Sequence, residues 1–262
     1  MGTGAAAGLA GSVLGVGGGV VVVPVLTLLY GLPVRYAVAV SLVAVAATSA
    51  SSAGSYLRQG RVDVPLALEL EVATAVGAVA AGLAAPFVPE GWLYLAFTLA
   101  VLYAAYGMLR PAVDPGTSDE EPGPSGEDRP EEGPPERRSN RGWGMAGMTG
   151  AGVASGLLGI GGGFAKVPVM HALMGVRLPV ATATSTFMIG MTAASSGWVY
   201  WARGDLSLAF AGPVALGVLA GGTAGARLSR HLPERWLRGL FVLLLLYVAV
   251  QMAWRGWTGV AG

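Results

Sequence analysis

Two glycine-rich stretches, each followed by a proline, are the residues of this chain best suited to binding chemistry. Gly15–Gly19 precedes Pro24, and Gly159–Gly163 precedes Pro168 at the same distance. Glycine interrupts a helix at a cost of about 1 kcal/mol per residue relative to alanine. An interrupted helix leaves backbone N–H groups without partners, and these groups bind small anions. The pattern therefore predicts an anion site, with tight helix packing as the alternative use of glycine.

Charged side chains inside apolar segments are the next candidates. Lys166 is the only lysine of the chain and lies three residues after the second glycine stretch, two residues before Pro168. An ammonium group in an apolar segment is costly and marks a binding site or a pathway. We expect it to pair with an anionic substrate, the alternative being a side chain that extends to the membrane surface. We expect Glu69 and Glu71 to lie near the interface, with proton transfer by one of them as the alternative.

Hydroxyl side chains recur on one face of the segment that follows each glycine stretch, at spacings of seven, four and four residues. They are Ser41, Thr48, Ser52 and Tyr56 in the first segment and Ser185, Thr192, Ser196 and Tyr200 in the second. Such hydroxyls donate hydrogen bonds to an oxyanion or join neighbouring helices, and both interpretations stay open. The predicted substrate site comprises Gly17, Gly18, Gly19, Pro24, Ser41, Gly161, Gly162, Gly163, Lys166, Pro168, Thr184 and Ser185.

The chain lacks the residues on which most enzymes and metal sites depend. It has no cysteine, two histidines, and neither a His-Glu-x-x-His nor a Gly-x-Ser-x-Gly motif. We therefore predict no enzyme activity, no metal site and no cofactor. The net charge of +1 gives no indication of a nucleic-acid partner.

The glycine stretches belong to a long internal duplication. Pro24 and Pro168 define an offset of 144 positions, and the same offset relates Trp92 to Trp236. A duplicated apolar unit with a glycine-rich interruption is typical of helix-bundle transporters.

The composition is that of an integral membrane protein. The 262 residues are 53% hydrophobic and 12% charged, with a mean hydropathy of +0.61, whereas soluble domains carry about 25% charged residues. The first transmembrane repeat is predicted at 1–110 and the second at 142–262. Between them, residues 111–141 are rich in proline and acidic side chains and are predicted to form a disordered cytoplasmic linker.

Each repeat contains four apolar segments. The last three have the length of about 20 residues that a helix needs to cross the hydrocarbon. The first is divided by its glycines, and we expect Val20–Val23 to be extended and a new helix to begin at Pro24 or Pro168. Such a segment either crosses as a discontinuous helix or returns as a re-entrant hairpin. The predicted fold is an all-α integral membrane protein with two four-segment repeats.

The arginines favour the hairpin, because positive charge accumulates on the cytoplasmic side. If the first segments are re-entrant, the repeats are inverted, and three of the fifteen arginines (Arg35, Arg203 and Arg255) lie outside. Eight plain spans would instead divide the arginines nine to six. We therefore predict inverted repeats with six spans, two hairpins and both termini outside. Eight spans in parallel repeats stay the alternative.

Both glycine stretches lie within a longer paired motif. It reads GLAGSVLGVGGG…PVL at 8–26 and GVASGLLGIGGG…PVM at 152–170, and Ala181–Ser185 and Gly60–Asp63 add shorter patterns. In these residues the chain resembles the sulfite exporter TauE/SafE family across both repeats. The resemblance implies a secondary transporter that moves sulfite, sulfonates or related organosulfur anions out of the cytoplasm, or in some cases into it.

Together these features predict a secondary transporter of a small anion in the cytoplasmic membrane. The expected activity is export of sulfite or an organosulfonate by alternating access. The alternatives are a small-anion channel, uptake of a sulfur-containing or carboxylate anion, and a membrane assembly factor without flux. A coupling proton or ion and a homo-oligomeric state are open alongside them.

Overall fold

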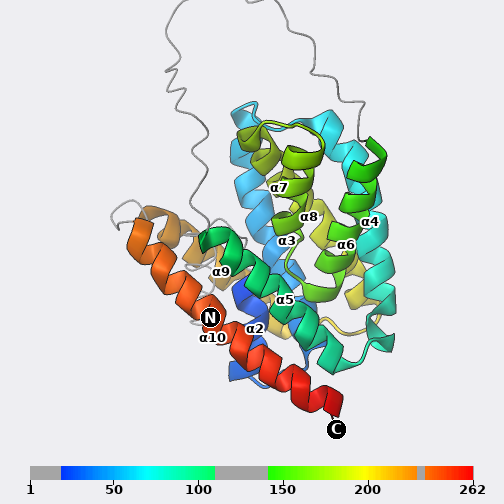
Figure 1. Ribbon diagram of the computed structural model, residues 1–262, viewed down its shortest axis with the longest axis vertical. Helices are drawn as coiled ribbons and strands as arrows, with labels where there is room; N and C mark the ends of the chain where they lie inside the picture. The colour runs from blue at the N-terminus through cyan, green and yellow to red at the C-terminus, as the bar shows by residue number, and fades with distance from the viewer. Residues whose placement is uncertain (1–18, 110–140, 229–233, 262) are drawn as a thin grey trace, which may run out of the picture.

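The computed structural model describes residues 19–109, 141–228 and 234–261. Every regular element in these ranges is a helix, which confirms the prediction of an all-α chain (Figure 1). Apart from Arg141, the predicted linker lies outside the described residues, as do Gly17 and Gly18 of the predicted site.

The first half of the chain folds into long helices separated by short turns. These elements are α2 (Gly19–Leu29), α3 (Val34–Arg58), α4 (Val64–Ala84), the short 3-10 helix η1 (Ala85–Phe87) and α5 (Glu90–Leu109). The turn before α4 contains Gly60 in the left-handed region, with φ of 64°, which glycine adopts without strain. Asp63 then caps α4, because its side chain accepts a hydrogen bond from the Leu66 N–H.

The second half follows the same order of elements. These are α6 (Arg141–Leu158), α7 (Gly163–Pro168), the π-helical turn η2 (Val169–Leu173), α8 (Leu178–Ala202), α9 (Leu208–Leu228) and α10 (Glu234–Ala261). Helix α8 begins 144 residues after α3, α9 begins 144 residues after α4, and α10 begins 144 residues after α5. The left-handed turn glycines Gly31 and Gly175 keep the same offset.

Both prolines after the glycine stretches lie inside helices, so the prediction that helices begin there is wrong. Helix α2 begins at Gly19 and contains both Val20–Val23 and Pro24, and α7 begins at Gly163 and ends at Pro168. Each proline is the sixth residue of its helix, so its missing N–H removes one helical hydrogen bond, the one to the carbonyl four residues earlier. After Pro168 the chain continues as the π-helical turn, where the hydrogen bonds are redistributed.

Helices α3 and α8 pack against each other in opposite directions. The Gly197 backbone approaches Leu42, whereas the Gly190 backbone approaches Ser49, which lies further along α3. The Ser49 hydroxyl also donates a hydrogen bond to the Thr186 carbonyl. Residues later in α3 therefore contact residues earlier in α8, so the two helices are antiparallel.

Helix α4 runs parallel to α8 and packs closely on α6. At the start of α4 the Asp63 N–H donates to Thr184 Oγ1 at 3.1 Å, and near its end the Gly82 carbonyl accepts from Arg203 at 2.6 Å. A Cβ atom on Gly152 would overlap the Thr74 carbonyl oxygen. Only glycine permits this approach of α6 to α4.

Helices α5 and α10 lie side by side at the edge of the bundle (Figure 1). The Gly256 backbone of α10 meets Gly91 and Leu95 near the start of α5. Arg255 reaches from α10 to the Thr27 carbonyl of α2 at 2.9 Å, which ties this pair to the rest of the bundle.

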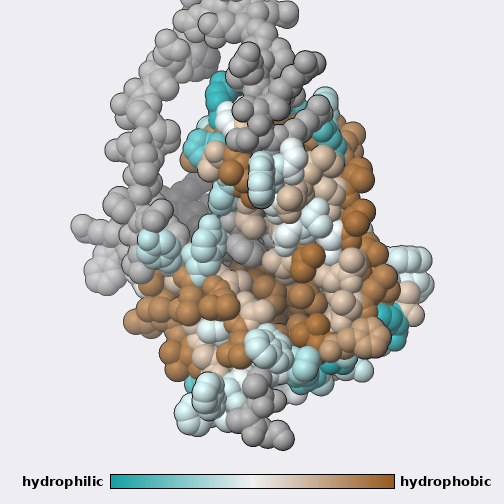
Figure 2. Space-filling model, turned by 45° about the vertical axis from the view of Figure 1, so that its right-hand side comes forward, coloured by the Kyte–Doolittle hydropathy of each residue, from teal (hydrophilic) through white to brown (hydrophobic). Residues whose placement is uncertain are grey.

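Apolar side chains cover much of the outer surface of the bundle, and Figure 2 shows them on one face as a broad hydrophobic region. Leu68, Val72 and Val76 project from α4, and Leu243, Val250 and Trp254 project from α10. Val34–Arg58 and Val64–Phe87 are, by length and composition, able to cross a membrane. An exposed apolar surface of this extent is stable in contact with lipid rather than water.

Candidate functional site

The second glycine stretch ends α6 and reverses the chain. Gly159, Gly161 and Gly162 have φ values of 68°, 83° and 72°, which side-chain-bearing residues rarely adopt. After this break, α7 and η2 run back along α6, because Val169 lies against Gly147 and Met174 against Gly144. The break and the two segments around it therefore form a helical hairpin.

The start of α2 meets this break directly. A Cβ atom on Gly19 would lie 2.5 Å from the Gly159 carbonyl oxygen. That oxygen accepts a hydrogen bond from the Ser41 hydroxyl at 2.8 Å. Three residues distant in the sequence, Gly19, Ser41 and Gly159, are thus brought together at the boundary between the two halves.

Apolar side chains cover the break on one side. A Cβ atom on Gly161 would lie 2.8 Å from both Val45 and Ile189, and one on Gly163 would lie 2.6 Å from Ile189. Val45 of α3 and Ile189 of α8 are counterparts under the 144-residue offset. These glycines therefore allow the close packing that was the alternative to ligand binding, and this side of the break is closed.

Two buried hydroxyls lie beside the break without a hydrogen-bond partner among the described residues. They belong to Ser155 of α6 and Ser185 of α8. A Cβ atom on Gly162 would lie 3.2 Å from the Ser155 Cβ, and one on Gly163 would lie 3.8 Å from the Ser185 hydroxyl. A buried polar group without a partner is costly, so these two hydroxyls are available donors for a ligand at the break.

Lys166 is fully buried and pairs with Glu71. Its Nζ atom donates to Thr192 Oγ1 at 2.5 Å and lies 3.5 Å from Glu71 Oε2. The Thr192 hydroxyl lies 2.6 Å from Glu71 Oε1. The three side chains come from α7, α8 and α4, and we call them the Lys166–Thr192–Glu71 triad.

The triad overturns the alternative interpretation of Lys166, a side chain that extends to the membrane surface, because Lys166 is fully buried. The Glu71 side chain is also almost completely buried within the protein. A buried ammonium requires a counter-charge, and Glu71 supplies it within the protein. The signal that could have revealed this pair is the presence of a single lysine and a glutamate, each within an apolar segment.

The other predicted residues occupy different surroundings. Thr184 of α8 is buried, and its hydroxyl accepts a hydrogen bond from the Asp63 N–H at the start of α4. Pro24 is buried inside α2, and Pro168 is exposed at the end of α7. The hydroxyl stripe of α8 is buried, with Tyr200 donating to the Gly156 carbonyl at 2.9 Å.

In the part of the chain that the structure describes, no group of three or more histidines, aspartates or glutamates is arranged to hold a metal ion. The polar groups beside the break are hydroxyls and glycine amides, and the Lys166 ammonium one turn further on is paired with the Glu71 carboxylate. Hydroxyls and amides are donors that suit an oxyanion rather than a cation.

Comparisons with known proteins agree with a transport function. The chain is 24% identical over 258 residues to YunE of Bacillus subtilis, named a probable membrane transporter protein, with 95% of this chain and 94% of YunE covered. It is 31% identical over 109 residues to MamO of Magnetospirillum gryphiswaldense, also named a probable membrane transporter protein, with 38% of this chain and 17% of MamO covered. No solved structure matches the chain.

The apolar helices and these relatives identify a multi-pass membrane protein. The model of the family described as "Sulfite exporter TauE/SafE" matches residues 1–252. The match covers both halves of the chain and therefore includes both glycine stretches. The chain belongs to the sulfite exporter TauE/SafE family of membrane transporters.

Proposed function

We propose that this protein is a secondary transporter of a small oxyanion, and that it exports sulfite or an organosulfonate across the cytoplasmic membrane. The observation that carries the proposal is the pair of buried, unpartnered hydroxyls of Ser155 and Ser185 beside the second glycine break. Hydroxyls and glycine amides beside one break in a helix can bind an oxyanion by hydrogen bonds alone. The family description supports sulfur oxyanions as the chemical class.

The two halves are inverted repeats in this proposal. Helices that occupy equivalent positions in parallel repeats run in the same direction, whereas those in inverted repeats run in opposite directions. Helices α3 and α8 begin at equivalent positions and pack antiparallel. The hairpin of α6, α7 and η2 is then the re-entrant segment of its repeat, with six other helices as full spans.

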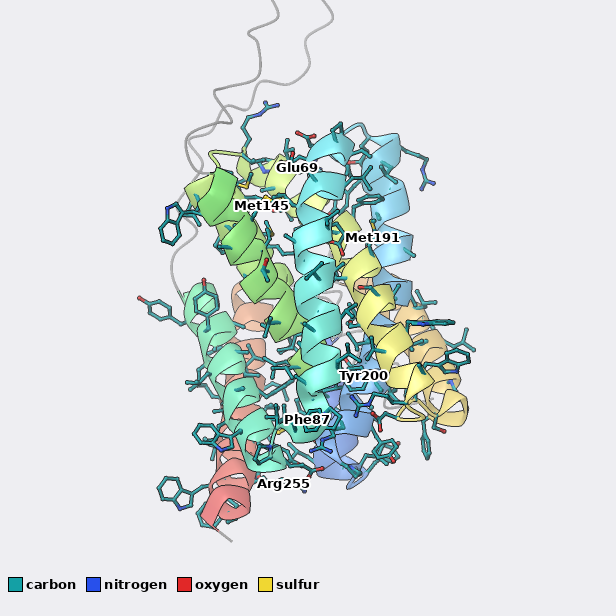
Figure 3. The ribbon with its side chains drawn as sticks, turned by 90° about the vertical axis from the view of Figure 1, so that its right-hand side faces the viewer. Glu69, Phe87, Met145, Met191, Tyr200 and Arg255 are labelled. Atoms are coloured by element: carbon teal, nitrogen blue, oxygen red, sulfur yellow. The ribbon has the colours of Figure 1, made fainter. Side chains whose placement is uncertain are left out.

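The positions of the arginines support the same orientation. Helix α4 extends along the length of the bundle. Figure 3 shows Glu69 and Met145 toward one end and Phe87 and Arg255 toward the other. The three arginines assigned to the outside donate to backbone carbonyls at the Phe87 end. Arg35 bonds Val88, Arg203 bonds Gly82 and Arg255 bonds Thr27. These three arginines serve as structural contacts. The other twelve arginines then set the orientation by the positive-inside rule, and this orientation makes the linker cytoplasmic.

Alternating access requires the closed side of the break to open. Val45 and Ile189 lie against Gly161 from the two halves, so rotation of one half against the other separates these side chains and uncovers the break. The bound anion then faces one side of the membrane at a time, as in transporters with inverted repeats.

Flux into proteoliposomes tests the function. Purified protein is reconstituted, and uptake of sulfite, sulfoacetate, sulfate and acetate is measured against a gradient of the unlabelled anion. We expect saturable counterflow of the sulfur oxyanions. Single-channel conductance would instead favour a channel, and absence of flux for every anion would overturn the proposal.

A further inference from the structure

We propose that Glu71 is a proton-binding site that couples proton movement to anion movement, because its protonation releases Lys166 to bind the anion. This inference rests on the proposed function, which it deepens by naming the co-substrate. The Glu71 carboxylate and the transported anion then compete for one ammonium group, and a proton decides which of them is bound.

The geometry of the triad fits this exchange. Thr192 lies between the two charged groups, 2.5 Å from Lys166 Nζ and 2.6 Å from Glu71 Oε1. The direct separation of Nζ from Glu71 Oε2 is 3.5 Å, long for a charge-assisted hydrogen bond. Thr192 accepts from the ammonium, so the ammonium stays partly satisfied when Glu71 becomes neutral.

The backbone of Lys166 lies one helical turn from the proposed anion site. The Lys166 N–H donates to the Gly162 carbonyl at 3.1 Å, which places Lys166 one turn after the glycine beside Ser155. On α4, Thr74 follows Glu71 by one turn and packs on Gly152 of α6, one turn before Ser155. The Lys166–Thr192–Glu71 triad and the unpartnered hydroxyls of Ser155 and Ser185 therefore belong to one cluster of packed helices.

Charge balance dictates that the proton and the anion bind together. With Glu71 ionised, Lys166 and Glu71 are together neutral, and an added anion would leave an excess negative charge buried in the protein. With Glu71 protonated, the neutral pair is Lys166 and the anion. An uncompensated buried charge is strongly unfavourable, so a monovalent anion and a proton move in the same direction.

The Lys166–Thr192–Glu71 triad has no second copy in the other half of the chain. Under the 144-residue offset, the counterparts of Lys166 and Glu71 are Val22 and Ala215, and only the counterpart of Thr192, Thr48, is polar. The Thr48 hydroxyl is bonded to carbonyls of its own helix. The expected stoichiometry is therefore one proton per anion.

The elements around Glu71 bring few other ionisable groups. These are Glu69 on α4 itself, Arg141 at the start of α6, His171 on η2 and Tyr200 on α8. His171 is exposed and bonded to the Val176 carbonyl, and Tyr200 lies at the far end of α4 beside Gly82. Lys166 is the one charge in contact with Glu71 in the part of the chain that the structure describes.

Binding and proton uptake test the coupling in the purified full-length protein. Methanesulfonate and sulfite are the probes, the first because its charge does not change between about pH 5 and about pH 8. We expect wild-type protein to take up one proton per bound methanesulfonate, and its affinity to fall about tenfold per pH unit once Glu71 ionises. Glu71→Gln, which mimics the protonated acid, is expected to bind as tightly as wild type at low pH, without proton uptake or pH dependence.

Three controls separate the possible outcomes. Glu69→Gln should keep the wild-type pH profile, and Lys166→Met should lose affinity at every pH. The double variant Glu71→Gln/Lys166→Met, whose triad is uncharged, should also bind weakly, which distinguishes a lost ammonium from misfolding. Equal affinity at all pH values in wild type, or an unchanged pH profile in Glu71→Gln, overturns the coupling alone. Absence of binding and flux for both probes overturns the proposed function.

Discussion

The hydroxyl groups around the second break differ in what they bond, and this difference separates structural from ligand-binding serines. Ser41 donates to the Gly159 carbonyl, whereas its counterpart Ser185 has no partner among the described residues. Ser155 resembles Ser185 in this respect. The chain thus offers a matched pair of substitutions at equivalent positions.

Ser185→Ala is expected to weaken sulfite binding about tenfold, the loss of one hydrogen bond to a charged ligand, while leaving the stability of the protein nearly unchanged. Ser41→Ala should instead lower the free energy of unfolding by about 1–3 kcal/mol, because the buried Gly159 carbonyl loses its donor. Anion titration and thermal unfolding in detergent measure both effects. A larger loss of stability in Ser185→Ala than in Ser41→Ala would contradict the assignment.

The Lys166–Glu71 pair should show strong energetic coupling. Lys166→Met alone leaves a buried carboxylate without its partner and should destabilise the protein by about 3–5 kcal/mol. The double variant with Glu71→Gln removes both charges and should recover most of that loss. Thermal unfolding of wild type, both single variants and the double variant measures the coupling, and additive effects would show that the pair does not interact.

The paired glycine stretches and the single lysine could be read from the sequence, because a run of glycines breaks a helix and an ammonium group is rare in an apolar segment. A single lysine and two glutamates in apolar segments suggest an ion pair, but the sequence could not show that Glu71 rather than Glu69 neutralises Lys166. The two residues are 95 positions apart in the chain and meet only because α4 and α7 both pack on α8. It also could not show which serines are bonded already. Ser155 was missed because it lies outside the repeated hydroxyl stripe.

At the scale of the helices, close contacts between backbones at glycine positions hold α4 to α6. Gly77 of α4 and Gly152 and Gly156 of α6 each bring a backbone within van der Waals contact of the opposite helix. In lipid, where apolar side chains gain little from burial, such backbone approach is a main source of helix association.

Gly152→Ala should therefore separate α4 from α6, because its Cβ would overlap the Thr74 carbonyl. We expect a loss of about 1–3 kcal/mol or more. Gly150 lies on the same helix with nothing near its Cβ position, so Gly150→Ala is the control and should stabilise the protein by about 0.5–1 kcal/mol. Thermal unfolding compares them, and equal effects would mean that the α4–α6 contact contributes little.

The helical segments themselves were predicted well and their internal details less so. Helix lengths and the 144-residue offset follow from apolar runs and turn glycines such as Gly60 and Gly204. The start of α2 was mispredicted because local preferences, four valines before Pro24, favour an extended chain. Burial of these valines against α3 outweighs that preference.

For the whole molecule, the inverted arrangement makes a prediction about sidedness. Pro33 and Arg177 occupy equivalent N-cap positions of α3 and α8, and both are exposed. Because the chain has no cysteine, Pro33→Cys and Arg177→Cys each carry a single thiol. In cells, an impermeant thiol reagent should label Pro33→Cys from outside, and Arg177→Cys only after the membrane is opened.

Gln59→Cys is the control for this experiment, since Gln59 follows α3 at the same end of the bundle as Arg177. It should behave as Arg177→Cys does. Labelling of Pro33→Cys and Arg177→Cys from the same side would indicate parallel repeats with eight spans.

The central claim is that an oxyanion binds where the two halves meet, at the second glycine break. A structure of the purified protein in saturating methanesulfonate tests it most directly. Density for the sulfonate is predicted within hydrogen-bond distance of the Ser155 and Ser185 hydroxyls, the Gly162 and Gly163 amides and the Lys166 ammonium. A sulfonate bound elsewhere in the bundle, with the break still packed by Val45 and Ile189, would contradict it.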